Sequence, residues 1–168
     1  QAAQTNLVAN VTATGATVAG ANQCLTVNRT NPSVAKTFGA ASITDGSATT
    51  LVFTLSNTGT NPAQGGITVG DTLPAGLTIN SATPAVAYSA GCSGPATAAY
   101  NGGTKVLSGL TGLSMANGTA SCTVTVSGLT NSAGQTGTCP QAAQTNLATS
   151  VTTTGASNAS TDQCLTVN

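Results

Sequence analysis

The sequence predicts an all-β fold and, within that class, an antiparallel β-sandwich. Thr, Ser, Ala, Gly, Val and Asn dominate the 168 residues. Side chains branched at Cβ fit a pleated sheet, whereas Gly and Asn fit turns. Several short segments alternate apolar and polar residues with a period of two, and turn clusters separate them about every ten residues. No segment has the spacing of an amphipathic helix, so two packed sheets of short strands are favoured.

Two segments show the strand pattern most clearly, 47–56 (SATTLVFTLS) and 120–127 (ASCTVTVS). Every second residue in each is apolar, so one face of each strand should point into the core. The core-facing rows are Leu51, Phe53 and Leu55 in the first segment and Cys122, Val124 and Val126 in the second. The same pattern predicts shorter strands at 67–69, 77–79, 105–107 and 165–167. The turn clusters between them are 57–62, 73–76, 101–103 and 116–118.

Charged side chains are too few for several classes of function. The chain has no His, no Glu and no Trp, a net charge of zero, and only 4% charged residues. The basic residues are Arg29, Lys36 and Lys105, and the acidic residues are Asp45, Asp71 and Asp162. Nucleic-acid binding needs a basic stripe with stacking aromatics, so we expect no nucleic-acid partner. No apolar run is long enough to span a bilayer, so we expect no membrane insertion.

Catalytic and metal-binding chemistry also lacks its usual residues. General acid–base catalysis needs a poised His or carboxylate, and a Cys nucleophile needs a base such as His. Asp45 and Asp71 stand beside Gly or Thr at expected turns, where an Asp side chain commonly caps the turn. The chain has no CxxC and no DxD pattern, which argues against zinc and calcium sites. We therefore expect no enzymatic activity, no catalytic residue, no metal and no cofactor.

The two ends of the sequence repeat each other. Residues 1–28 return as 141–168 at a constant offset of 140, with 19 of the 28 positions identical. Self-similarity at a fixed spacing is typical of tandem-repeat proteins. We therefore expect a repeat unit of about 140 residues, with one unit and a piece of its neighbour in this chain.

Two stretches resemble a known family. The first, 34–79, opens with VAKTF and contains DTLPAGL; the second, 92–126, is a Cys–Gly-rich–Cys section. Both are similar to the Ig-like tandem repeat domains of large bacterial cell-surface proteins. The resemblance implies a secreted Ig-like β-sandwich, with a boundary near RTNPS. The expected parts are 1–28 as the closing strands of a preceding repeat, 29–33 as a linker, and 34–168 as a complete repeat.

The five cysteines fit this division. Cys24 and Cys164 occupy the same position one repeat apart, so each unit holds four cysteines. The resemblance implies a Cys92–Cys122 pair, and Cys122 also stands in a core-facing row. Cys164 should point away from the core, and we expect it to pair with Cys139 on the outer face; a bond to a neighbouring chain is the alternative. Two disulfides per unit indicate an oxidising compartment, and we expect the partner of Cys24 to lie outside this unit.

One lysine raises a chemical alternative. Bacterial adhesin domains sometimes join Lys to Asn through an isopeptide bond that a buried acid assists. Lys36 falls in the first expected strand, and Asn146 and Asn168 fall in late strands. A lysine is usually solvated, however, and a solvated side chain is what we expect of Lys36.

Apolar residues of the opening segment predict association. Leu7, Val11, Leu25 and Val27 form an apolar face that an isolated hairpin cannot bury. We expect them to pack on an adjacent unit, in the same polypeptide or in another subunit. The candidate strands 119–127 and 143–153 carry no charge, although natural sheet edges usually carry protecting charges. At least one edge should therefore be covered by a neighbouring unit.

These expectations favour a structural role outside the cytoplasm. The sequence predicts a structural repeat unit of an extracellular or cell-surface filament, sheath or stalk, partnered by neighbouring copies of the same repeat. The alternative is an adhesin module that binds a sugar or a protein on another surface, with no ligand identified. Repetition, disulfides and low charge favour the structural role, because each of them serves assembly.

Overall fold

The computed structural model describes residues 4–6, 14, 20, 22–25, 30–58 and 63–168. The chain divides into two compact units, Gln1–Thr30 and Asn31–Asn168. Nearly all regular structure among these described residues is β-strand, and the larger unit has two packed sheets and two disulfides. The prediction of an all-β sandwich is confirmed. No helix among the described residues is long and apolar enough to cross a membrane.

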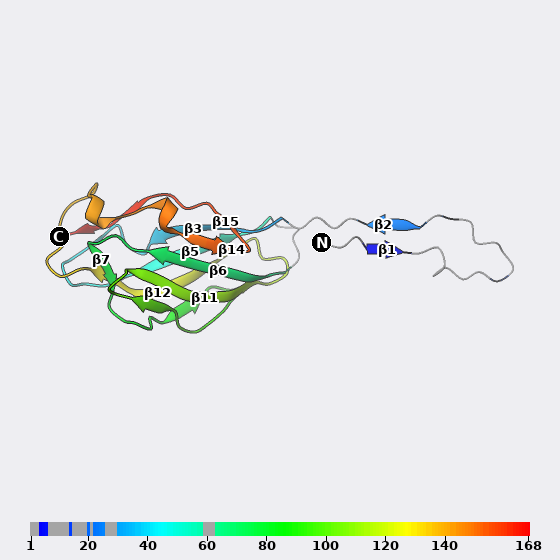
Figure 1. Ribbon diagram of the computed structural model, residues 1–168, viewed down its shortest axis with the longest axis horizontal. Coiled ribbons are helices and arrows are strands. Elements are labelled where there is room, and N and C mark those ends of the chain that lie inside the picture. Colours follow the sequence, from blue (N-terminus) through cyan, green and yellow to red (C-terminus); the bar gives the residue numbers. More distant parts are fainter. Residues whose placement is uncertain (1–3, 7–13, 15–19, 21, 26–29, 59–62) are drawn as a thin grey trace. The chain divides into compact units, whose positions relative to one another are not determined.

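The larger unit contains two main sheets, whose principal strands run along its length (Figure 1). The five-stranded sheet has the order β10-β11-β6-β14, with β9 paired to β11. Its strands are β6 (Gln64–Thr72), β9 (Cys92–Ser93), β10 (Ala99–Asn101), β11 (Val106–Met115) and β14 (Thr152–Thr154). The six-stranded sheet has the order β15-β3-β5-β12-β7, with β8 paired to β12. Its strands are β3 (Ser33–Phe38), β5 (Thr49–Ser56), β7 (Leu77–Ile79), β8 (Val86–Tyr88), β12 (Ser121–Asn131) and β15 (Ser157–Asn158).

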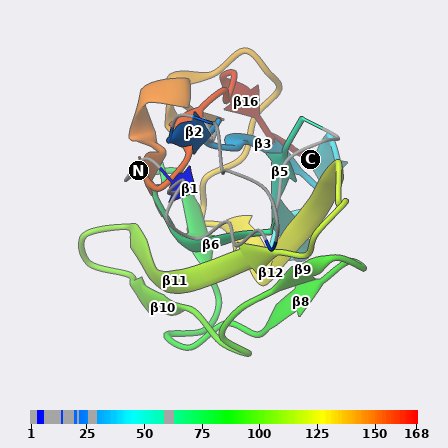
Figure 2. The ribbon, with the colours of Figure 1, turned by 90° about the vertical axis from the view of Figure 1, so that its right-hand side faces the viewer.

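Short elements near the C-terminus complete the larger unit. They are the 3-10 helices η2 (Ala142–Gln144) and η3 (Ala148–Ser150) and the strand pairs β13 (Thr145–Asn146) with β16 (Gln163–Cys164) and β4 (Ser42–Ile43) with β17 (Thr166–Val167). Figure 2 shows this C-terminal segment, orange to red, on the opposite side of the unit from β8, β9 and β10 in green. The described strand pairs are antiparallel, as predicted, except for the two short pairs β3–β15 and β4–β17, which are parallel. In these two pairs the C-terminal strands β15 and β17 run in the same direction as β3 and β4, respectively.

The core lies between the sheets, where the expected rows meet. Leu51, Phe53 and Leu55, the inward-facing row of β5, are fully buried, and β12 contributes its own expected row. Leu110 and Leu113 of β11 and Ile67 of β6 are also fully buried. Each fully buried large apolar side chain contributes about 1.5–3 kcal/mol, so these rows stabilise the sandwich. The expectation that Phe53 belongs to the core is confirmed.

Strand β11 is much longer than the segment 105–107 that the alternation predicts. Its buried leucines are spaced by three residues, at Leu107, Leu110 and Leu113, because the pairing with β6 is irregular between them. Gly109 and Gly112 stand in the gaps with positive φ angles of 80° and 67°. A bulge adds a residue to one strand, and Gly adopts positive φ without a steric penalty. The bulges therefore return each leucine to the core although the sequence does not alternate.

Of the two uncharged candidate segments, 119–127 lies mostly in an interior strand, whereas 143–153 reaches β14 at the edge of the five-stranded sheet. Strand β12, which contains most of 119–127, is interior and pairs with β5 on one side and with β7 and β8 on the other. It needs no protecting charge, because its backbone groups are already paired. The segment 143–153 is divided among η2, β13, η3 and β14. The segment 119–127 therefore does not supply an edge strand, and the expectation that a neighbouring unit covers at least one sheet edge stays a prediction.

The smaller unit contains the antiparallel strands β1 (Gln4–Asn6) and β2 (Gln23–Leu25). Thr5 pairs with Cys24, and Asn6 pairs with Gln23. In the larger unit the equivalent positions pair in the same way, Thr145 with Cys164 and Asn146 with Gln163. Both hairpins thus have one register at an offset of 140 residues. Three of the predicted assembly residues, Leu7, Val11 and Val27, and the side chain of Leu25 lie outside what is described.

Candidate functional site

Lys36 is buried between the sheets of the larger unit, so the expectation of a solvated side chain is wrong. Its relative exposure is 1%. Strand β3 alternates, and Lys36 shares the inward-facing row with Val34. A buried ammonium group requires a charged or strongly polar partner, because its desolvation is costly. The sheet on the other side of the core supplies that partner.

Asp71 faces Lys36 from strand β6, in the inward row that begins with Ile67 and Val69. The Lys36 Nζ atom lies 3.4 Å from Asp71 Oδ1, and both side chains are fully shielded from solvent. The expectation that Asp71 caps a turn is therefore wrong, because β6 continues past it to Thr72. Asp45 does lie in a turn, where its Oδ1 accepts a hydrogen bond from Asn131 Nδ2 at 2.7 Å.

The second oxygen of Asp71 contacts an amide. Asn146, on β13, is fully buried, and its Nδ2 donates to Asp71 Oδ2 at 2.6 Å. One carboxylate therefore holds the Lys36 amine at one oxygen and the Asn146 amide nitrogen at the other. The three side chains come from β3, β6 and β13, which are far apart in the sequence.

Ser150, at the end of η3, connects the same groups. Its Oγ accepts a hydrogen bond from Lys36 Nζ at 2.9 Å and lies 2.6 Å from Asn146 Oδ1 and 2.8 Å from Asp71 Oδ1. A hydroxyl has one hydrogen and donates to one acceptor at a time. Lys36 Nζ also donates to the main-chain carbonyl of Leu147. We call Lys36, Asp71, Asn146 and Ser150 the lysine cluster.

The surroundings of the lysine cluster change the basicity of the amine. Burial lowers the pKa of Lys36 below its ordinary value of 10.5, because desolvation penalises the charged form. The negative charges of Asp71 and, more weakly, of Asp162 act in the opposite direction without cancelling the effect of burial. At a given pH, a larger fraction of Lys36 is therefore in the neutral form, which is the nucleophilic one, than in a solvated lysine.

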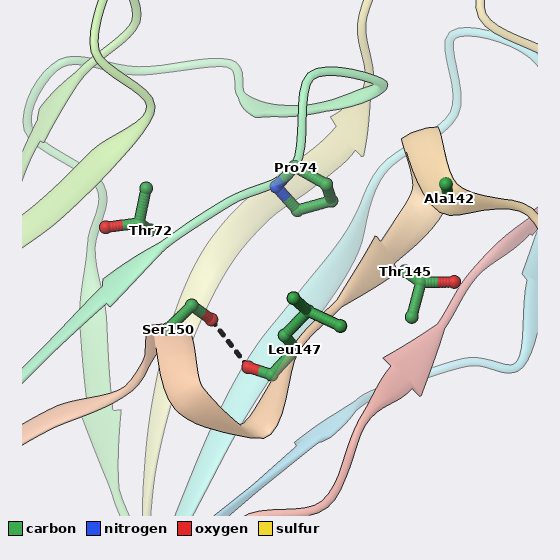
Figure 3. Close-up of a pocket in the computed structure, with 6 residues that line it drawn as sticks. All are labelled: Thr72, Pro74, Ala142, Thr145, Leu147 and Ser150. Carbon is green, nitrogen blue, oxygen red and sulfur yellow. Dashed lines mark hydrogen bonds between the residues drawn. The ribbon is translucent and has the colours of Figure 1, made fainter.

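A surface pocket adjoins the lysine cluster at Ser150 (Figure 3). Its volume is about 430 Å³, and it is lined by Thr72, Pro74, Ala142, Thr145, Leu147 and Ser150. Figure 3 shows the Ser150 hydroxyl bonded to the Leu147 carbonyl, and the Leu147 side chain is 51% exposed. Ser150 therefore lines the pocket, whereas the other three residues of the lysine cluster do not.

The two disulfides join the pairs that were expected. Cys92 is bonded to Cys122, which links β9 of one sheet to β12 of the other. Cys122 is 3% exposed and belongs to the core. Cys139 is bonded to Cys164, and both are half-buried outside the core. Two intrachain disulfides indicate an oxidising, non-cytoplasmic environment.

Two further predictions from the sequence concern Cys24 and metal binding. Cys24 lies in β2, whose side chains are outside the described part of the chain, so its external partner stays a prediction. Within the part that the structure describes, no three His, Cys, Asp or Glu side chains gather into a group able to hold a metal ion.

A family comparison covers most of the chain. The model of a family described as a domain of unknown function, DUF7933, matches residues 32–167. The chain belongs to the DUF7933 family. The DUF7933 domain includes the whole lysine cluster and both disulfides, whereas the β1–β2 hairpin lies outside the match. Neither a search of curated proteins nor one of solved structures finds a match.

The two motifs that suggested a family contain part of the lysine cluster. KTF begins with Lys36, and DTLPAGL begins with Asp71. In the latter, Leu73 and Leu77 are buried, and Gly76 closely approaches the backbone of Ala143. Alternation extended by two residues from Val69 would have placed Asp71 in the core row of the DUF7933 domain. No comparable pattern marks Asn146 or Ser150.

Proposed function

We propose that the chain is a structural repeat unit of an extracellular or cell-surface filament, sheath or stalk, built from tandem Ig-like β-sandwich domains. The observation that carries this proposal is the shared register of the β1–β2 and β13–β16 hairpins. The sequence similarity of the two segments is thus matched by the same strand pairing.

The place of the β13–β16 hairpin in its own sandwich supports the proposal that the β1–β2 hairpin packs on a neighbouring unit. In the larger unit, Asn146 bonds to Asp71, and Leu165, which follows β16, is fully buried. That hairpin is therefore an integral part of a sandwich. Asn6 and Cys24 occupy the positions of Asn146 and Cys164, so the first hairpin carries the residues to complete a sandwich of the same kind. The neighbouring unit belongs either to the same polypeptide or to another copy.

The two disulfides favour an extracellular location for such an assembly. Cys92–Cys122 fixes one sheet to the other, and Cys139–Cys164 closes the C-terminal segment. A disulfide limits the freedom of the unfolded chain, which stabilises a domain that has no Trp and only two Phe. Such stabilisation suits a protein that persists outside the cell.

Electron microscopy of the chain purified from an oxidising compartment tests the proposal. We expect concentration-dependent rods or filaments with a regular axial repeat. The matched control is the unit 31–168, which lacks the β1–β2 hairpin and should remain dispersed. Dispersed beads of the full chain at every concentration, together with binding to a glycan or protein array, would instead support the adhesin alternative.

A further inference from the structure

The lysine cluster is an unusual use of charge in this protein. Lys36 and Asp71 are two of only six charged residues in the chain, and both are buried. Replacing a buried ion pair by apolar side chains of similar volume often leaves stability unchanged or improves it. Stability alone therefore gives no reason to place these two residues in the core.

The contacts bring a nucleophile, an electrophile and a proton carrier together. Asp71 Oδ1 faces Lys36 Nζ, and Asp71 Oδ2 faces Nδ2 of Asn146. Ser150 Oγ also touches both sides, at 2.9 Å from Nζ and 2.6 Å from Asn146 Oδ1. The amine and the primary amide therefore share two bridging partners, Asp71 and Ser150, which keep the two groups in one cluster.

We propose that the folded domain joins Lys36 to Asn146 by an isopeptide bond, with Asp71 as the proton carrier. From the ion pair, a proton moves from Nζ to Asp71 and leaves a neutral amine. The lone pair on Nζ forms a bond to Cγ of Asn146, and the Cγ–Nδ2 bond breaks. Both protons lost by Nζ pass through the carboxylate to Nδ2, which departs as ammonium. One amine and one primary amide thus give one secondary amide, without an oxidant or another reactant.

The environment of the cluster supports each part of this step. Desolvation lowers the pKa of Lys36 and so favours its neutral form. Asn146 Oδ1 is one of three acceptors within reach of the single Ser150 hydrogen, and when Ser150 donates to it, the hydrogen bond polarises the carbonyl and stabilises the negative charge that develops on it. The side chains of the ion pair are shielded from solvent, which disfavours attack by water. In this proposal ammonium leaves through the pocket that Ser150 lines.

The reaction is a single self-modification and does not depend on the proposed assembly. It departs from the expectation that the chain contains no catalytic residue, because Asp71 contacts both reacting groups. It involves no turnover, so the expectation about enzymatic activity is a separate matter.

Intact mass spectrometry of the folded full chain tests the bond directly. We expect the mass of the reduced, denatured chain to be about 17 Da below the mass calculated from its sequence, because one ammonia molecule is lost. A mass equal to that of the sequence would overturn the proposal. A gain of about 1 Da would do the same, because it would show deamidation of Asn instead of cross-linking.

Tryptic digestion locates the bond, because the chain has cleavage sites only at Arg29, Lys36 and Lys105. A free Lys36 would give the peptides 1–29, 30–36, 37–105 and 106–168 after reduction and alkylation. The bond blocks cleavage at Lys36 and attaches 106–168 to 30–105. We therefore expect the peptide 1–29 and one branched product. Recovery of a separate 30–36 peptide in full yield would contradict the proposal.

Matched variants separate the reacting groups from other residues of the same type. Lys36→Arg keeps the charge without a competent nucleophile, and Asp71→Asn removes the proton carrier; both should restore the full mass. Lys105→Arg and Asp45→Asn should keep the loss. A cross-linked Asp71→Asn chain would refute the role of Asp71, and the wild-type mass decides the bond itself whether or not a variant folds.

Discussion

A single methyl group at Gly76 should destabilise the domain strongly, because this glycine lies against another backbone segment. A Cβ atom built on Gly76 would lie 2.3 Å from the carbonyl oxygen of Ala143 and 2.8 Å from its carbonyl carbon. The amide of Gly76 donates to that same carbonyl at 2.7 Å. Gly76→Ala must therefore push η2 away and weaken this hydrogen bond. Asn146 follows η2 by two residues, so the lysine cluster should also be disturbed.

The magnitude follows from two contributions. Overpacking a well-packed site costs about 1–3 kcal/mol, and a lost intramolecular hydrogen bond costs about 1 kcal/mol. We therefore expect Gly76→Ala to lower the free energy of unfolding by about 2–4 kcal/mol. The matched control is Gly65→Ala on β6, where an added Cβ would meet no heavy atom within 4 Å.

Denaturant unfolding followed by far-ultraviolet circular dichroism measures both variants, because the chain has no Trp for fluorescence. Gly65→Ala should change the free energy of unfolding by less than about 1 kcal/mol, and in the stabilising direction, because Ala reduces the freedom of the unfolded chain. Equal effects of the two substitutions would refute the close approach of Gly76 to Ala143. A normal rate of isopeptide formation in Gly76→Ala would refute its link to the lysine cluster.

Two further predictions concern the bulged strand and the buried amine. Leu107→Ala should cost about 2–5 kcal/mol and Val106→Ala about 0.5 kcal/mol in the same unfolding assay, because Leu107 is fully buried and Val106 is 37% exposed; similar costs would contradict the bulged register. The variant Asn146→Ala cannot form the bond, so its Lys36 keeps a free amine whose pKa in the folded state is below 10.5. Below pH 10.5 the unfolded chain therefore binds a proton at Lys36 more readily than the folded chain does, and the free energy of unfolding should decrease as the pH falls. The wild-type chain, whose Lys36 nitrogen would be an amide, should lack this slope when the two pH series are compared, and a shared slope would count against the bond.

The architecture of the domain could be predicted from the sequence because most of its strands alternate. Strand β7 has the predicted bounds, and β5 and β12 differ from their predicted segments only at the ends. Both alternating rows, including Phe53, lie in the core. Strand β11 could not be predicted in full, because Gly109 and Gly112 introduce bulges that turn a period of two into a period of three.

The lysine cluster could be predicted only in part, for a different reason. Lys and Asp are usually exposed, and each is buried only when it is paired. Lys36 and Asp71 pair across two sheets, so neither local segment contains the evidence for the other. Asn146 and Ser150 come from a segment of short 3-10 helices and a two-residue strand, which no regular sequence pattern marks. The residue type alone therefore predicted a solvated Lys36, and only the fold shows the buried pair.

The position of the lysine cluster determines how the unit would respond to tension. Lys36 lies in the first strand of the larger unit, and Asn146 lies close to its C-terminal end. With the proposed bond in place, a pulling force applied at the two ends of the unit passes from β3 directly to β13. Residues 37–145 then bear none of the applied force, so about 360 Å of chain cannot be extended. A series of such units would behave as a nearly inextensible cable, in which sandwiches could lose their folded packing without a large increase in length.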